Sequence, residues 1–184
     1  MPGGRDRRPN AVVELQLNRV DLNDVLSDPS GVPTRLLADV WGLTECTLLW
    51  ANRGAVAYRL QLEPWLALRD EGYPTERVGL MVAADGNVYA TPHQADGRAW
   101  RHRYSWQASM FGQLCLWDPS DPAALRWDWQ DGLVSFVTIV HRHLQAEEFA
   151  RRHGVWPAED SPHGAGLRPL RTEQMRSAAV GWRR

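Results

Sequence analysis

The sequence predicts an α+β domain, in which a curled antiparallel meander of about four strands is flanked by an N-terminal helix and backed by one long helix. Two observations support this prediction. Short segments of alternating apolar and polar residues follow one another between residues 45 and 83, with turn residues between them. The strongest helical pattern, Leu133–Phe149, comes after these segments and does not alternate with them. Strands that alternate with helices would indicate a parallel sheet, so this order favours antiparallel pairing.

Length and composition fit one globular domain with a leader and a tail. The chain has 184 residues, of which 43% are hydrophobic, and this is enough for a sizeable core. We expect residues 1–10 to be a flexible leader, residues 11–164 to form the domain, and residues 165–184 to form a tail or a peripheral helix. The leader has no apolar stretch behind it, unlike a secretory signal. No apolar run reaches the roughly 20 residues of a membrane span.

A short helix is expected before the strands, in the segment VPTRLLADVWGL. Pro33 is tolerated in the first turn of a helix, and Gly42 is a common stop signal. Apolar residues recur at helical spacing, at Leu36, Leu37, Val40 and Trp41. A weaker alternation near the N-terminus is strand-like, at Val13, Leu15 and Leu17.

Three further segments have the pattern of strands. The segments Glu45–Trp50 and Ala55–Glu63 are joined by a turn that contains Gly54, which indicates a hairpin. A third strand is expected at about Val78–Ala83. No period is sustained over Ala90–Phe111, which we interpret as a long loop. Its basic and aromatic middle, RAWRHRYSW, favours a surface that docks a partner or covers the core.

The long helix is predicted from an apolar stripe with a period of about 3.6 residues. The stripe consists of Leu133, Phe136, Val137, Val140, Leu144 and Phe149. Asp131 is expected to cap its start and Gly154 its end. His141 and His143 are two residues apart, so on a helix they face different ways and cannot hold one metal together. We expect one of them to be solvated and the other partly buried.

Cysteine usage and net charge suggest a protein of the reducing cytoplasm with no general attraction to nucleic acid. The two cysteines, Cys46 and Cys115, form neither a disulfide framework nor a C-x-x-C motif. Cys46 falls within a predicted strand, where a core position is expected. The net charge is −1, which gives no global pull toward a polyanion.

All 21 basic residues are arginine, and the chain has no lysine. GC-rich codon usage explains this bias. A chain that handles amine-reactive thioesters would also benefit from lacking lysine, because it could not become its own acceptor. The two explanations are compatible, and both stay open.

Cys115 in the stretch MFGQLCLWDP is either a buried core thiol or a nucleophile at the mouth of a loop. Cysteine is among the most buried residue types, which favours the first interpretation. Leu114 and Leu116 would place Cys115 on the opposite face of an extended segment. The following run DPSDP stops any strand at once, which favours the second interpretation.

Carboxylates dominate the chain after Cys115. Four of them precede the long helix, namely Asp118, Asp121, Asp128 and Asp131. Nearby negative charge raises the pKa of a thiol, which is unfavourable for a protease nucleophile. It is tolerable for a cysteine that receives an already activated acyl group, because carboxylates attract an incoming amine and accept its proton.

The order of these motifs resembles that of the ubiquitin-conjugating-enzyme family. The family's "YP" looks like Tyr73-Pro74, and its His-Pro-Asn segment looks like Thr91–His93. Its catalytic "G-x-I/L-C-L" turn looks like Gly112–Leu116. The tryptophan before the next helix would be Trp127 or Trp129.

The resemblance is closest to bacterial members encoded beside cyclic-oligonucleotide synthases in antiphage (CBASS) operons, and it spans about Pro33 to Gly164. Leu114–Trp117, Trp156 and His163-Gly164 look like their motifs. Two features depart from the family pattern. The usual asparagine is missing, and His93 stands in its place, 22 residues before Cys115 (115 − 93). The second proline that normally follows "YP" is absent as well.

The resemblance implies the fold of a ubiquitin-conjugating enzyme and a thioester-transfer activity. Cys115 would carry the C-terminal glycine of a partner protein as a thioester and transfer it to an amine. His93 would stabilise the oxyanion, Asp118 or Asp121 would orient the amine, and His163 is a possible additional site residue. No cofactor or metal is implied.

The implied partner is a protein with a C-terminal glycine, either a cyclic-oligonucleotide synthase or a ubiquitin-like protein, delivered by an activating enzyme or by an activated synthase. One alternative is a catalytically silent adaptor of the same fold that binds such proteins. Another is a cysteine hydrolase that uses Cys115 with His141, His153 or His163.

Overall fold

The computed structural model describes residues 19–93, 98–104, 112–117, 121–122 and 126–157. The predictions for the leader, for the weak strand at Val13–Leu17 and for the tail at 165–184 fall outside these residues. Among the described residues, no helix is long and apolar enough to cross a membrane.

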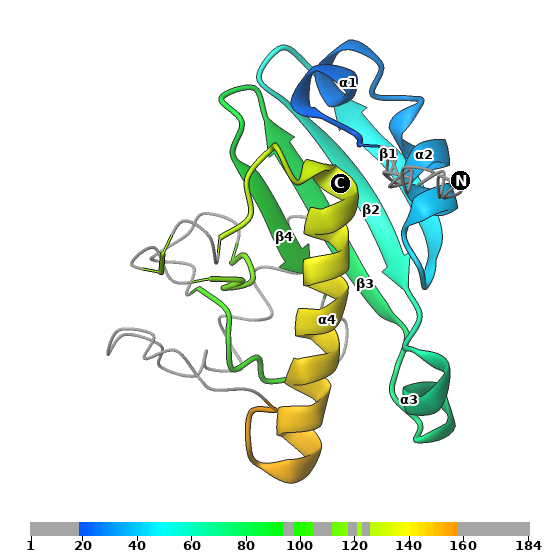
Figure 1. Ribbon diagram of the computed structural model, residues 1–184, viewed down its shortest axis with the longest axis vertical. Coiled ribbons are helices and arrows are strands. Elements are labelled where there is room, and N and C mark those ends of the chain that lie inside the picture. Colours follow the sequence, from blue (N-terminus) through cyan, green and yellow to red (C-terminus); the bar gives the residue numbers. More distant parts are fainter. Residues whose placement is uncertain (1–18, 94–97, 105–111, 118–120, 123–125, 158–184) are drawn as a thin grey trace, which may run out of the picture.

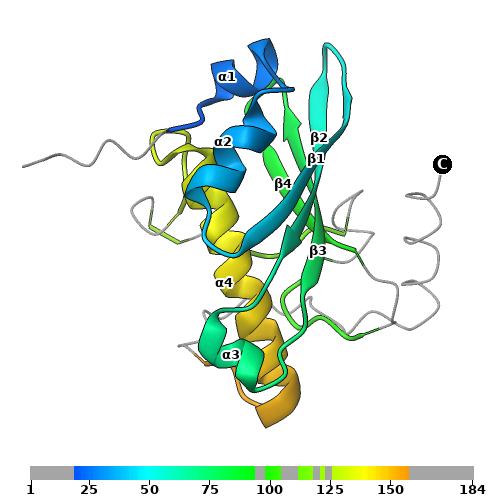
Figure 2. The same ribbon diagram turned by 90° about the vertical axis from the view of Figure 1, so that its right-hand side faces the viewer.

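The described chain is α+β, with one four-stranded antiparallel sheet and helices on its core side (Figures 1 and 2). The strands follow one another in the order β1-β2-β3-β4, as a meander should. The strands are β1 (Leu43–Ala51), β2 (Ala55–Leu62), β3 (Glu76–Ala83) and β4 (Val88–Pro92). The helices are α1 (Leu22–Ser27), α2 (Val32–Asp39), α3 (Leu66–Asp70) and α4 (Gly132–His153). The predicted fold class and antiparallel pairing are confirmed.

The prediction of a loop from Ala90 onward is wrong for its first residues, because β4 continues to Pro92 and pairs with β3. The pairs Leu80↔Ala90 and Val78↔Pro92 extend the ladder. The alanine and the proline of β4 have low strand propensity, so the sequence pattern did not predict this strand. Proline is tolerated at a strand end, where its missing N–H costs least.

Two short helices were not predicted. Helix α1 begins with a capping box: Asp21 accepts from the N–H of Asp24 at 2.8 Å, and Asp24 accepts from the N–H of Asp21 at 3.1 Å. Helix α3 has five residues and none of them is buried, so it leaves no apolar stripe to detect. Helix α2 confirms the predicted helix, with Leu36 buried against the sheet, but it ends at Asp39, so Val40 and Trp41 lie beyond it and Gly42 is not its stop.

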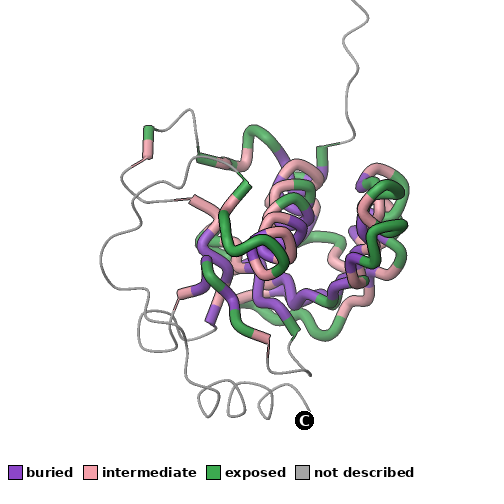
Figure 3. The backbone as a smooth tube through the Cα atoms, turned by 90° about the horizontal axis from the view of Figure 1, so that it is seen from below, coloured by how far each residue is buried: buried purple, intermediate pink, exposed green. Residues whose placement is uncertain are grey.

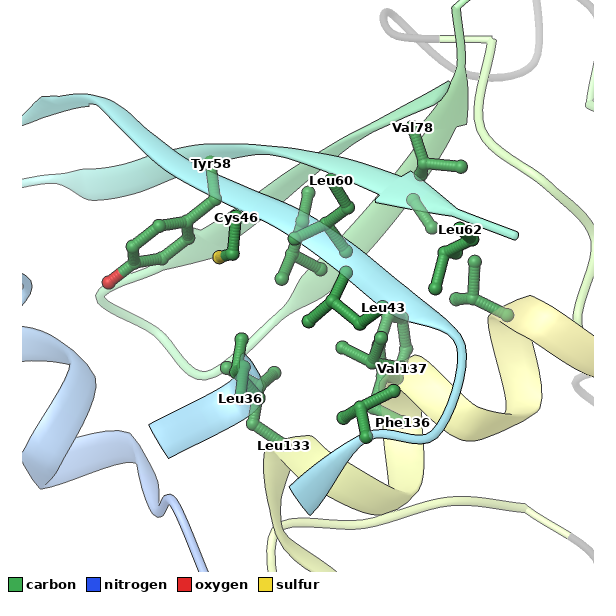
Figure 4. Packing of buried hydrophobic residues seen from close by; sticks show 14 of the residues in the cluster. Leu36, Leu43, Cys46, Tyr58, Leu60, Leu62, Val78, Leu133, Phe136 and Val137 are labelled. Atoms are coloured by element: carbon green, nitrogen blue, oxygen red, sulfur yellow. The ribbon is translucent and has the colours of Figure 1, made fainter. Parts of the chain in front are cut away.

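The core lies between the sheet, α2 and α4, where the buried residues, purple in Figure 3, face one another. The apolar stripe of α4 faces it, with Leu133, Phe136, Val137, Val140 and Leu144 at most 1% exposed. Side chains of β1 and β2 meet this stripe, including the predicted core residue Cys46 (Figure 4). Burial of these apolar side chains supplies most of the favourable free energy of folding.

The two ends of α4 show one correct and one wrong prediction. Gly154 ends the helix in the left-handed conformation with φ 74°, as predicted. Asp131 precedes the helix but makes no side-chain cap. Its carboxylate instead accepts from the N–H of Asp128 at 3.2 Å, inside the turn before the helix. The N–H of Leu133 is satisfied by the carbonyl of Val20 at 2.8 Å.

Candidate functional site

Cys115 lies in an extended segment, Gly112–Trp117, that is hydrogen-bonded on both sides. The N–H of Leu114 donates to the carbonyl of Ala90 in β4 at 2.8 Å. The N–H of Cys115 donates to the carbonyl of His102 at 2.9 Å. The segment therefore continues the sheet beyond β4 for a few residues, without being a regular strand.

The Cys115 side chain is buried but lies outside the apolar core. Leu114 belongs to the core cluster and Leu116 packs against it, whereas Cys115 belongs to neither group. Side chains alternate along an extended chain, so the sulfur lies on the other side of the segment. Its Sγ is 3.7 Å from the carbonyl oxygen of Trp117, and the residue is 4% exposed.

The sequence prediction of Cys115 at an open loop mouth is thus wrong in its exposure, although the opposite-face argument holds. The segment around His102 runs beside Cys115 and is hydrogen-bonded to it. Sequence spacing could not reveal this pairing, because the two segments are not adjacent in the chain.

His102 is the residue directly opposite Cys115. Arg103 and Leu114 form an antiparallel bridge, so the next pair along the ladder is His102 with Cys115. Directly opposite side chains lie on one face with Cβ atoms about 5 Å apart. His102 is 3% exposed. The backbones of a buried cysteine and a buried histidine are therefore hydrogen-bonded neighbours.

His102 was missed by the sequence reasoning, which treated its segment as a docking or covering surface. A signal was present. Rings stand at every second position, at Trp100, His102 and Tyr104, with arginines between them, which is the alternation of an extended segment. The His102 ring packs at 4.1 Å from Trp156 and at 6.0 Å from His143, measured between centroids.

Glu147 of α4 holds the His102 segment in place. Its carboxylate is completely buried and accepts from the N–H of Arg101 at 2.9 Å and from the N–H of His102 at 2.5 Å. Loss of water raises the pKa of Glu147, and the two backbone N–H groups and the nearby Arg151 guanidinium oppose this rise. These donors are what makes a buried carboxylate tolerable. Glu147 is therefore a positioning residue for His102.

A network of charged side chains joins β3, the His102 segment and the end of α4. Arg98 binds both oxygens of the buried Glu76, at 2.6 and 2.7 Å. Arg151 lies 2.8 Å from Glu148 and stacks over the Trp100 ring at 5.0 Å. Bidentate arginine–carboxylate pairs fix geometry better than single contacts do. The network thus anchors a segment that has few sheet hydrogen bonds.

Three tryptophans pack together near the start of α4, between the Cys115 segment and the helix. Trp127 packs at 5.0 Å from Phe136 and at 5.1 Å from Trp129, and Trp117 packs at 6.1 Å from Phe136. The Trp129 indole donates to the carbonyl of Gly86 at 2.7 Å. Trp127 and Trp129, the two candidates for the tryptophan before the helix, therefore belong to one aromatic cluster with Phe136. Trp117 joins the Cys115 segment to the same cluster.

His93 lies at the surface just beyond β4. Its N–H donates to the carbonyl of Arg77 at 2.7 Å, and the residue is exposed. Ala90, which accepts from Leu114, is three residues earlier, and this corresponds to roughly 10 Å along a strand. His93 therefore stands at the rim of the Cys115 region, whereas the His102 backbone is hydrogen-bonded to that of Cys115.

The predicted carboxylates are described in part. Asp121 is half-buried, and Asp128 and Asp131 are exposed in the turn before α4. Asp118 and the possible additional residue His163 lie outside the described residues.

The histidines of the hydrolase alternative occupy other places. His141 is buried between Trp41 and Trp65, with ring centroids 6.5 and 6.1 Å away, on the α2 side of α4. His153 is exposed in the last turn of α4. The expectation of one solvated histidine is wrong, because the side chain of His143 is 8% exposed beside Glu147. The structure thus brings His102, and not His141, next to Cys115.

Cys46 is chemically inert by comparison. It is 8% exposed, and its burial, together with the negative charge of Glu45, raises its pKa to about 12. Almost none of it is thiolate near neutral pH. The described residues contain no group of three or more His, Cys, Asp or Glu side chains arranged to hold a metal ion.

Comparison with protein-family models, with curated proteins and with solved structures finds no match for this chain.

Proposed function

We propose that this protein is a cysteine-dependent acyl carrier enzyme of the ubiquitin-conjugating type, in which Cys115 carries the C-terminal glycine of a partner protein as a thioester. The observation that carries the proposal is the backbone pairing of two buried residues, Cys115 and His102, neither of which belongs to the main apolar cluster. The order of elements supports it: a helix, a four-stranded meander, the cysteine segment, tryptophans and a long helix follow one another as in the family that the sequence resembles.

Loading is a thiol–thioester exchange. His102 accepts the proton of the Cys115 thiol, and the thiolate attacks the carbonyl carbon of the donor thioester. The tetrahedral intermediate collapses by expelling the donor thiolate, which takes up the proton from His102. One thioester bond is formed and one is broken, so no oxidant or reductant is needed.

Transfer repeats this chemistry with an amine. The amine attacks the Cys115 thioester, an amide forms, and the Cys115 thiolate leaves. The amine loses one proton, which passes to a base of the site and then to the thiolate. In this proposal His93 donates a hydrogen bond to the oxyanion, and Asp118 or Asp121 orients the amine. A donor aimed at a developing oxyanion contributes about 3–4 kcal/mol in characterised sites.

The partner in this proposal is a protein with a C-terminal glycine, either a cyclic-oligonucleotide synthase or a ubiquitin-like protein, in cytoplasmic antiphage defence. An activating enzyme, or an activated synthase, would supply the donor thioester. Neighbouring genes give an inexpensive test. A cyclic-nucleotide synthase or an activating enzyme encoded next door supports conjugation, and an isolated gene favours the adaptor.

A direct test uses a synthetic peptide that ends in a glycine thioester as the donor. We expect wild type and Cys46→Ala, the matched buried-cysteine control, to gain the peptide mass and to lose it on thiol treatment. Cys115→Ser should form an oxyester that resists thiol, and Cys115→Ala should gain nothing while keeping its circular dichroism spectrum. A thiol-sensitive adduct that persists in Cys115→Ala would refute the assignment. Release of the free peptide acid without amide product would indicate a hydrolase.

One observation favours a second candidate function, the catalytically silent adaptor. Cys115 is 4% exposed, so a donor reaches its sulfur only if neighbouring chain yields. An adaptor would bind the glycine-terminated protein equally well as wild type and as Cys115→Ala, and would form no adduct with millimolar peptide thioester.

A further inference from the structure

Two tryptophans line an open pocket of about 460 Å³ on the side of the molecule away from Cys115. The pocket, which we call the tryptophan pocket, is formed by Asp39, Trp41, Trp65, Thr138 and His141. The first three come from the end of α2 and the start of α3, and the last two come from α4. Helix α2 packs on β1, whereas Cys115 is hydrogen-bonded into the segment beside β4, and β1 and β4 are opposite edges of the sheet (Figure 1).

The rings of the tryptophan pocket are arranged as an open cage. The Trp41 and Trp65 centroids are 6.4 Å apart, and the ring planes are inclined by 58°. Trp41 is 56% exposed and Trp65 is 40% exposed, which is unusual for the largest aromatic side chain. His141 stacks at 26° to Trp41 and closes the floor. Much of the aromatic surface therefore faces the pocket or solvent instead of the core.

Gly42 allows this arrangement. Its φ is +81°, and a Cβ at this position would lie 2.6 Å from Cε1 of His141 and 2.9 Å from the carbonyl oxygen of Glu63. A larger residue would displace the His141 ring or the backbone at Glu63. Gly42, three residues after the end of α2, thus allows His141 to line the pocket.

A carboxylate without a compensating cation lines the pocket. Among the described residues, no donor bonds to Oδ2 of Asp39, which is shielded from water. A carboxylate at the wall of an aromatic pocket attracts a cation. His141 does not supply that cation, because burial lowers its pKa and leaves the ring neutral near pH 7. The Gln145 amide lies 2.8 Å from its Nε2.

We propose that the tryptophan pocket binds the guanidinium group of an arginine side chain presented by a partner protein. A guanidinium is planar and weakly hydrated, stacks on indole faces and donates paired N–H bonds to a carboxylate. A quaternary ammonium has no N–H for Asp39. A lysine ammonium can lie over an indole face, but it lacks the planar shape and the paired N–H groups of a guanidinium. The exposed Leu37 and Leu66, in the same stretches of chain as Asp39 and Trp65, favour a protein surface over a free guanidine compound. The proposal does not depend on the function of Cys115.

The test titrates ¹⁵N-labelled protein with the blocked tripeptide Ac-Leu-Arg-Leu-NH₂ and follows the indole N–H resonances. Trp41→Phe and Trp65→Phe assign the two pocket resonances, and the exposed Trp50 of β1 serves as the control. Ac-Leu-Cit-Leu-NH₂ contains citrulline, which has the shape of arginine without its charge. Ac-Arg-NH₂ separates a protein-borne arginine from a free guanidinium compound.

We expect saturable shifts of Trp41 and Trp65 with the arginine tripeptide and none at Trp50. Citrulline should bind at least about tenfold more weakly, and so should arginine against Asp39→Asn, because each removes one charge from a charge-assisted bond. Ac-Arg-NH₂ should also bind more weakly than the tripeptide. Equal binding of arginine and citrulline, unchanged binding to a folded Asp39→Asn, or no shift at millimolar peptide would each overturn the proposal. Tighter binding of Ac-Arg-NH₂ would overturn the choice of a protein partner.

Discussion

The two cysteines of this chain are both buried, yet they are buried by opposite means. Cys46 sits in the regular ladder of β1 and β2 among apolar side chains of the core. Cys115 sits in an irregular segment whose neighbour is held by the buried Glu147 and a network of arginines. An apolar surrounding makes a thiol inert, whereas a polar surrounding places proton acceptors beside it. Burial alone therefore does not distinguish the two cysteines, but the kind of burial does.

The largest loss of stability is expected from a substitution in the apolar core. Phe136 of α4 is completely buried and contacts both Trp117 and Trp127. Phe136→Ala should lower the free energy of unfolding by about 3–5 kcal/mol, because it opens a cavity in the core. Phe149→Ala, at a half-buried position of the same helix, is the control and should cost clearly less. Urea denaturation measures both, and equal losses would contradict the proposed position of the core.

On the polar side, Glu147→Ala should cost about 2–4 kcal/mol, because two buried N–H groups lose their acceptor. Glu147→Gln keeps one acceptor oxygen and should cost less. Hydrogen exchange should accelerate most at Arg101 and His102 in the alanine variant. Unchanged exchange there would mean that Glu147 does not position the His102 segment.

The smaller structural effect concerns Cys46. Cys46→Ala removes a buried sulfur and should cost about 1 kcal/mol by the transfer free energy of a group of that size. Its raised pKa, about 12, predicts that native Cys46 resists iodoacetamide at pH 8. Mass spectrometry of the Cys115→Ala variant isolates Cys46. Fast labelling in the folded protein would contradict its place in the core.

The smallest effect is a pH dependence from Glu147. Its pKa is raised in the folded protein, so the folded state holds this proton more tightly than the unfolded state does. Its contribution to stability is fully present below the ordinary glutamate pKa of 4.5 and is lost as the pH rises through the folded pKa. The stability of wild type relative to Glu147→Gln should therefore fall as the pH rises above 4.5. A difference that is constant with pH would contradict the raised pKa.

Sequence reasoning worked where one residue pattern decides the structure. The apolar stripe of α4 and the alternation of β1–β3 were readable because burial on one face imposes a period. The Cys115 region was not readable in this way. Its order comes from long-range groups such as Glu147, which lies 45 residues from His102. A buried carboxylate that accepts from backbone N–H groups leaves no periodic trace in the sequence.

The candidate site was predicted in part for the same reason. Cys115 stands out by its own motif, but the histidine whose backbone pairs with it is His102, which the motifs did not indicate. Spacing along the chain cannot express such pairing. The tryptophan pocket was also missed, since Asp39, Trp65 and His141 are far apart in the sequence.

The most direct measurement compares the two thiols inside one wild-type molecule. The protein is incubated with the glycine-thioester peptide at neutral pH, quenched in acid, digested with pepsin and analysed by mass spectrometry. We expect the acyl group on Cys115 and not on Cys46, with His102→Gln slowing its appearance by roughly a hundredfold, as for loss of a general base. Acylation of Cys46 to the same extent, or loading of Cys115 at an unchanged rate in His102→Gln, would contradict the proposed pairing of thiol and imidazole.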